Sequence, residues 1–183
     1  MRMQPKQPTS VTSRFFAGLT EYAFQTRLGI ADPPLTDYLS DMLIRFVRSD
    51  NVYRVRDLRG RPLTKVADMV VEGDACVGPS RREVHRHIGD FILFWTGVYP
   101  EALRRLKGPH SKDLFVNYCA QGKRSYYIAS TISVAEKAQD KASKDVLERL
   151  SNQFELCMAG LAEVRRKLDC HNDASAGPDA LLL

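Results

Sequence analysis

Apolar residues recur at intervals of three and four along most of this chain, which places them on one face of an α-helix. The strongest case is the stretch 81–98, where Val84, Ile88, Phe91 and Trp95 line one face. The other stripes lie within 15–26, 35–46, about 63–70, 112–138 and 141–168. This periodicity predicts an all-α protein.

The predicted architecture is an irregular bundle of about six or seven helices. The stretches 112–138 and 141–168 should form a C-terminal antiparallel pair of long helices, because the gap between them is so short. Ser80, followed three residues later by Glu83, fits a capping box at the start of the 81–98 helix. Ile88, Phe91 and Trp95 are expected at the centre of the core.

The main interruption of the helical pattern lies between Ser49 and Pro62. Valine and tyrosine alternate briefly with polar residues there, and the stretch ends on Gly60 and Pro62. We expect a strand-like segment or an ordered loop. A hairpin is the alternative, although the sequence offers no second strand to pair with it.

The length of 183 residues suits a single domain with a core of its own. We expect a flexible leader over 1–10, one helical domain over 11–169 and a disordered tail over 170–183. No apolar run approaches the roughly 18 residues that a membrane span needs, and the polar start of the chain lacks the apolar segment of a secretory signal. These features predict a soluble, cytoplasmic protein without membrane contact.

Cysteine usage also favours the cytoplasm. The four cysteines (76, 119, 157 and 170) stand alone and form no CxxC pair, which is typical of reduced thiols. Cys170 and His171 are adjacent, but no second pair exists to complete a tetrahedral zinc site. The sequence therefore assigns no metal and no cofactor.

Three residues of the 81–98 helix could form a ligand site. Glu83, His87 and Asp90 are spaced four and then three apart, so they lie on one side of the helix beside its apolar face. A carboxylate–histidine–carboxylate column could bind a metal or hold a histidine as a general base. The structural alternative is a helix cap plus hydrogen bonds to a neighbouring helix. His85 falls on the opposite side from His87.

A second polar group falls on an apolar helix face. Tyr118, Gln121 and Ser125 share a face with aliphatic residues, and Gly122 beside them could admit another backbone. Buried polar groups need hydrogen-bond partners, so these three side chains could line a small pocket opposite His87 and Asp90. The alternative is an interhelical hydrogen-bond network that sets the helix register.

The third feature is a basic stretch. Six arginines fall within 45–61, opposed in that span by Asp50 and Asp57; they are Arg45, Arg48, Arg54, Arg56, Arg59 and Arg61. Such a surface could meet phosphate or an acidic protein. No nucleic-acid-binding signature accompanies it, and arginines near helix ends are often solvated or paired with acids.

These features support three functional hypotheses. The first is a non-enzymatic interaction or regulatory module that binds a protein partner, or a second copy of itself, through a helical face and the arginine surface. The second is a small-molecule or metal-binding protein, or an enzyme, that uses Glu83, His87, Asp90 and Tyr118. The third is weak nucleic-acid binding through the arginines, for which a net charge of +5 is modest.

Overall fold

The computed structural model describes residues 11–47, 52–57, 59–101, 111–134 and 142–175, with side chains except at 111–116 and 171–175. Within this part the chain forms seven α-helices and one π-helical turn, and no strand. The elements are α1 (Val11–Glu21), η1 (Tyr22–Arg27), α2 (Pro33–Val47), α4 (Val66–Ala75), α5 (Gly78–Gly97), α7 (Ser111–Thr131), α8 (Lys144–Asn152) and α9 (Phe154–Ser175). The predicted all-α bundle is confirmed.

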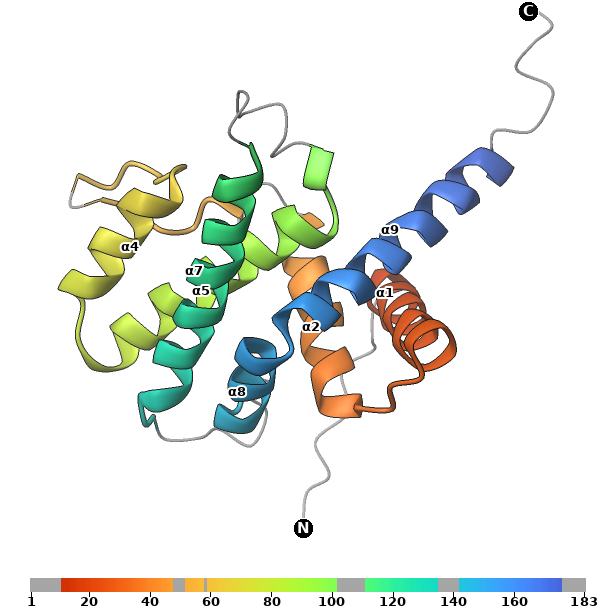
Figure 1. The fold of residues 1–183 in the computed structure, drawn as a ribbon, viewed down its shortest axis with the longest axis horizontal. Helices are drawn as coiled ribbons and strands as arrows, with labels where there is room; N and C mark the ends of the chain where they lie inside the picture. Colours follow the sequence, from red (N-terminus) through yellow and green to blue (C-terminus); the bar gives the residue numbers. More distant parts are fainter. Residues whose placement is uncertain (1–10, 48–51, 58, 102–110, 135–141, 176–183) are drawn as a thin grey trace, which may run out of the picture.

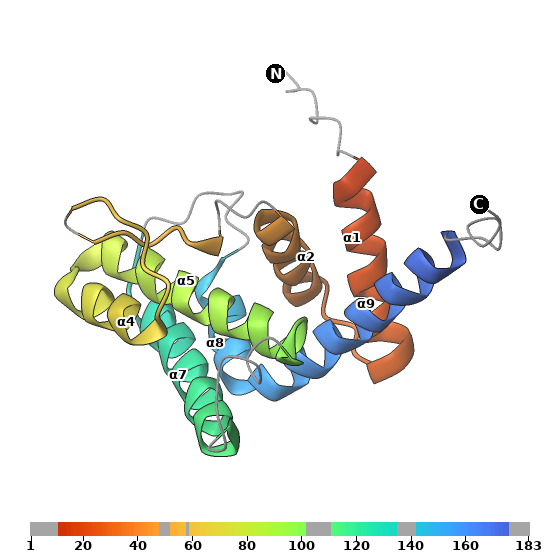
Figure 2. The same cartoon turned by 90° about the horizontal axis from the view of Figure 1, so that it is seen from above.

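Helix α5 is the centre of the packing. It contacts α4, α7 and α9, while α1 pairs with α2 and α8 packs against α7 and α2. In Figure 1, α4, α5 and α7 lie on one side of the molecule, α1 and α2 lie on the other, and α9 runs from the middle past α1. Figure 2 shows the same arrangement from above, with α5 between α4 and α9.

The core follows the apolar stripes. Ile88, Ile92 and Leu93 of α5 are fully buried, and Phe91 is nearly so. Trp95 differs from its expected central position, because it is only half-buried and packs at the edge of the core.

Residues at the helix starts explain where several of the helices begin. Asp32 accepts a hydrogen bond from the Leu35 amide at 3.3 Å, and Ser143 accepts one from the Val146 amide at 3.3 Å, so each satisfies a free amide at the start of its helix. The predicted capping box at Ser80 and Glu83 is wrong. Helix α5 begins at Gly78, Pro79 occupies its first turn, and no side chain caps it. Proline suits this position because its missing N–H has no helical partner there.

The predicted long helix over 141–168 is divided in two. The backbone leaves helical geometry at Gln153 (φ −113°, ψ 31°), so α8 packs on α7 while α9 turns away toward α5 and η1. Helix α9 then continues to Ser175, beyond Leu168 where its apolar pattern ends. The predicted leader over 1–10 and the end of the predicted tail, 176–183, lie outside the described residues.

The segment that was predicted to interrupt the helices forms an ordered turn over its described residues, 52–57 and 59–62. An isolated antiparallel bridge joins Arg56 to Pro62. The Asp57 carboxylate accepts the amides of Arg59 and Arg61 at 2.8 and 2.9 Å, and Gly60 adopts φ 77°. Glycine suits this turn because side chains rarely tolerate positive φ. Residues 49–51 and Leu58 of the predicted segment lie outside the described residues.

Candidate functional site

The three α5 residues that were expected to form one ligand site lie in three different environments. Glu83 pairs with Arg86 at 2.8 Å and with Arg82 at 3.5 Å. His87 is buried, and its Nε2 lies 3.1 Å from the carbonyl oxygen of Val52. Asp90 is fully buried among helices α2, α5 and α7. The three side chains therefore engage different neighbours rather than one common ligand position.

Asp90 is the centre of a buried polar network. Its Oδ1 accepts hydrogen bonds from the hydroxyls of Tyr38 at 2.6 Å and Tyr126 at 2.8 Å. Its Oδ2 lies 3.1 Å from a guanidinium nitrogen of Arg45. The network joins α2, α5 and α7 and sets their mutual register, which agrees with the structural alternative raised for Asp90.

The electrostatics of this network keep its donors protonated. Burial, followed by the charge of Asp90, raises the pKa of Tyr38 and of Tyr126 far above the ordinary value. Burial is the largest single influence on Arg45 and opposes its charge, but Asp90 and Tyr38 together outweigh burial and raise the Arg45 pKa. Both tyrosines therefore remain hydrogen-bond donors to Asp90.

Sequence reasoning overlooked Tyr38 and Tyr126 as partners of Asp90. Tyr38 falls on the apolar stripe of α2, and a phenol hydroxyl on a buried face requires a polar partner. Gly89 is the second signal, because a Cβ at this position would lie 2.8 Å from the Tyr126 ring. Gly89, next to Asp90, therefore indicates where the Tyr126 ring packs against α5.

The three polar residues expected on α7 lie elsewhere. Gln121 donates to Ser125 at 3.1 Å, and Ser125 is fully buried. Tyr118 and Gln121 face α4, where they line a shallow surface depression together with Val66 and Val70. Gly122 admits the ring of Phe154 rather than another backbone, since a Cβ there would lie 2.6 Å from Phe154 Cζ. The structure does not bring these residues opposite His87 and Asp90.

The arginine surface is only partly available to a partner. Arg45 pairs with Asp90, Arg61 pairs with Asp57, and Arg56 donates to the Gly60 carbonyl at 2.9 Å. Arg54 and Arg59 are exposed and form no ion pair with another described residue. Arg48 lies outside the described residues.

Two of the expected clusters meet at a polar pocket of about 400 Å³. The 52–57 segment, α4 and the start of α5 form it, and its lining residues are Arg54, Val55, Arg56, Glu72, Pro79, Ser80, Glu83, Val84 and His87. The structure thus brings Glu83 and His87 together with Arg54 and Arg56. Asp90 and the α7 residues do not line this pocket.

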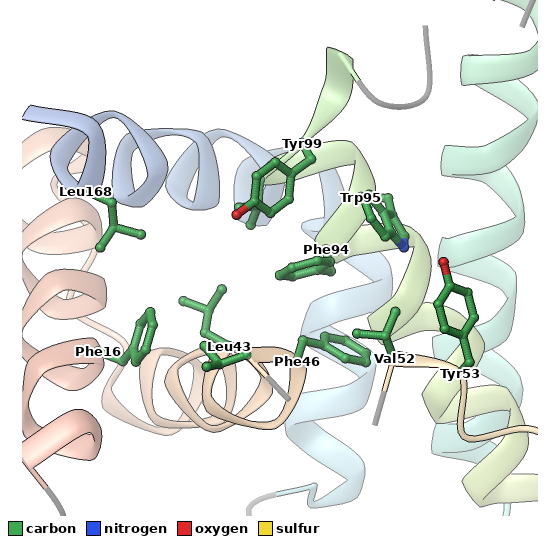
Figure 3. Close-up of a pocket in the computed structure, with 11 residues that line it drawn as sticks. Phe16, Leu43, Phe46, Val52, Tyr53, Phe94, Trp95, Tyr99 and Leu168 are labelled. Atoms are coloured by element: carbon green, nitrogen blue, oxygen red, sulfur yellow. The ribbon is translucent and has the colours of Figure 1, made fainter. Parts of the chain in front are cut away.

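A larger cavity, about 460 Å³, lies on the other side of the 52–57 segment (Figure 3). Helices α1, α2, α5 and α9 enclose it with two residues of the segment, and its lining residues are Phe16, Leu43, Phe46, Val47, Val52, Tyr53, Phe94, Trp95, Val98, Tyr99 and Leu168. None of these is charged. Figure 3 shows Phe16 and Leu168 at one end and Tyr53 and Trp95 at the other, so the cavity is elongated.

Trp95 carries a buried polar atom that has no partner among the described residues. Its indole Nε1 is buried and makes no hydrogen bond within the described part of the chain. Figure 3 shows this nitrogen on the side that faces Tyr53. A buried donor without an acceptor costs about 1–3 kcal/mol. An acceptor on a bound molecule would remove that cost.

The spacing of the cavity residues explains why sequence analysis overlooked this site. Its walls come from positions as far apart as Phe16 and Leu168, and most of them belong to apolar helix faces that have the same pattern as ordinary core residues. The only available signal was the cluster of aromatic residues at the end of α5. Phe94, Trp95 and Tyr99 pack there with ring centroids 5.5–5.9 Å apart.

Among the residues that the structure describes, no group of three or more histidine, cysteine, aspartate or glutamate side chains is arranged to hold a metal ion. No described helix has the length and apolar character needed to cross a membrane. Comparison of the chain with protein-family models, with curated proteins and with solved structures finds no match.

Proposed function

We propose that this protein is a binding module that holds an elongated, mostly apolar small molecule in the cavity between α1, α2, α5 and α9. The observation that carries the proposal is the cavity itself. Its volume of about 460 Å³ falls within the range of roughly 300–1,000 Å³ found for small-molecule sites. Its walls are apolar and aromatic, as such sites require.

The buried part of the lining favours a small molecule over a protein surface. Phe46, Phe94 and Val98 are each less than a tenth exposed, whereas Val47 and Tyr99 are exposed, so a ligand that enters past these two would contact the core. Burial of an apolar ligand stabilises the complex by about 25 cal/mol per Å² removed from water. The wall is built by segments from both halves of the chain, which favours a preformed site.

The ligand also needs one hydrogen-bond acceptor. The buried indole N–H of Trp95 lies toward one end of the cavity and is otherwise unsatisfied within the described chain. A carbonyl or ether oxygen at the end of an apolar chain would meet this donor once the indole ring turns toward the ligand, because the nitrogen is closed to solvent in the structure. The proposed ligand class is therefore an apolar chain or ring system with an acceptor at one end.

This proposal follows the small-molecule alternative raised from the sequence rather than the leading hypothesis of a module that binds a protein partner. It places the ligand in the aromatic cavity instead of at Glu83, His87, Asp90 and Tyr118. We further propose the cytoplasm as its location, since the four cysteines are free thiols and reduced thiols are typical of that compartment.

Binding of the neutral dye Nile red, followed by its fluorescence, tests the cavity. Leu168→Phe adds volume at one end of the cavity, and we expect it to weaken dye binding by about tenfold or more. The matched control is Val71→Phe on α4, where the side chain is 72% exposed and lies outside the cavity. Equal dye binding by both variants and the unmodified chain would reject the cavity as the site.

A further inference from the structure

The polar pocket holds two opposite charges that are not compensated within the described chain. Arg54 reaches it from the 52–57 segment, and Glu72 reaches it from α4. Neither forms an ion pair with another described residue. In contrast, Glu83 in the same pocket is paired with Arg82 and Arg86, and Arg56 donates to the Gly60 carbonyl.

The remaining lining is neutral and partly apolar. Val55 is 7% exposed, and Val84 and Pro79 add further apolar surface. His87 contributes no positive charge at neutral pH, because burial lowers its pKa below the ordinary value. Its Nε2 lies 3.1 Å from the Val52 carbonyl oxygen. Ser80, in the first turn of α5, supplies a hydroxyl.

We propose that this pocket binds a small zwitterion with an apolar side chain, of the class of free apolar α-amino acids. Arg54 receives the carboxylate of the ligand, and Glu72 receives its ammonium group. The apolar side chain packs on Val55 and Val84. Each uncompensated charge of the pocket thereby gains a partner.

Ligands with a single charge fit the lining less well. A simple anion would meet Arg54 and Arg56 but would also approach the carboxylates of Glu72 and Glu83. A simple cation would meet the glutamates but would approach the arginines. Like charges in a partly buried site repel one another, so only a ligand with both signs uses the pocket without that repulsion.

The experiment is isothermal titration of the full chain with three compounds that share the branched apolar chain of leucine. L-leucine carries both charges, isocaproate lacks the ammonium group, and isopentylamine lacks the carboxylate. We expect leucine to bind at least about tenfold more tightly than either analogue, since each charged hydrogen bond contributes that much. Leucine that does not bind at millimolar concentration would overturn the proposal.

Three variants locate the binding. Arg54→Ala and Glu72→Gln should each weaken leucine binding by about tenfold or more. Arg59→Ala is the matched control, because Arg59 belongs to the same turn but does not line the pocket. Tighter binding of isocaproate to Glu72→Gln, without loss of leucine binding, would identify a plain anion site and overturn the proposal. Equal effects of Arg54→Ala and Arg59→Ala would do the same, because binding would then come from general surface charge. Circular dichroism checks that each variant keeps its helices.

Discussion

Nε2 of His87 lies 3.1 Å from the carbonyl oxygen of Val52, and this hydrogen bond holds the wall between the two pockets. Val52 lines the apolar cavity, and His87 lines the polar pocket. The His87 ring also meets Phe46, a cavity residue, with centroids 5.8 Å apart. One buried imidazole therefore supports both sites.

The shared wall predicts a variant that affects both sites at once. His87→Ala removes the hydrogen bond that positions the 52–57 segment, and we expect several-fold weaker binding of both Nile red and leucine. Arg54→Ala should affect leucine alone, and Leu168→Phe should affect Nile red alone. Titrations of each variant with both ligands make the comparison. A folded His87→Ala protein with two unchanged affinities would contradict the shared wall.

The Asp90 network should contribute to folding cooperatively. Tyr38→Phe and Tyr126→Phe each remove one hydrogen bond to a buried carboxylate, and each should lower the free energy of unfolding by about 1.5–3 kcal/mol. The two hydroxyls donate to the same oxygen, so the double variant should not show the sum of the single effects. Urea unfolding of the four proteins completes this cycle. Strict additivity would show that the hydroxyls act independently.

Two glycine-to-alanine substitutions should have opposite effects. A Cβ at Gly89 would lie 2.8 Å from the Tyr126 ring, so Gly89→Ala should lower the free energy of unfolding by about 1–3 kcal/mol. A Cβ at Gly18 in α1 would meet no neighbouring side chain or other element within 4 Å, so Gly18→Ala should raise stability by about 0.5–1 kcal/mol. Thermal unfolding measures both. A stabilised Gly89→Ala protein would show that the ring has room to move.

Stability should fall as the solution becomes mildly acidic. Burial lowers the pKa of His85 and of His87 below the ordinary 6.5, so the unfolded chain takes up protons there that the folded chain does not. The stability is therefore complete above about pH 6.5 and declines as the pH falls from that value toward the folded-state pKa values. Each unit by which a pKa is lowered accounts for about 1.4 kcal/mol.

Urea unfolding at about pH 7.5 and about pH 5.5 measures this decline. The carboxylates with lowered pKa values, such as Asp57 and Glu163, titrate below this window and do not interfere. His87→Gln should reduce the decline, and a double variant with His85→Gln should reduce it further. If the double variant loses as much stability between the two pH values as the unmodified chain, groups other than these two histidines cause the decline.

Periodicity predicted much of the fold because apolar spacing reports directly which helix face is buried. It placed α2, α5 and α7 and the ordered turn after α2. It did not predict the break at Gln153, since the apolar stripe continues through Phe154 and Leu161 and no glycine or proline marks the bend. The misplaced start of α5 arose because Ser80 and Glu83 match a capping pattern, whereas Pro79 sets the first turn.

The sites were harder to predict than the helices. Spacing on α5 predicted that Glu83, His87 and Asp90 lie on one side of the helix, but in the structure each one engages a different neighbour. The neighbouring helix that each one meets depends on tertiary packing, which helical spacing does not contain. The cavity depends on contacts between α1 and α9, more than a hundred residues apart, and its apolar lining has the same sequence signature as core.

The most direct test of the cavity follows the Trp95 indole N–H in a proton–nitrogen correlation spectrum. Trp95 is the only tryptophan in the sequence, so this signal is unique. Methyl heptanoate, an apolar chain with a carbonyl acceptor at one end, is the titrant. We expect a saturable downfield shift of the indole proton, as it gains an acceptor, that is lost in Leu168→Phe and retained in Val71→Phe. An indole signal that stays unchanged to the solubility limit of the ester would contradict the proposed role of Trp95 and the cavity.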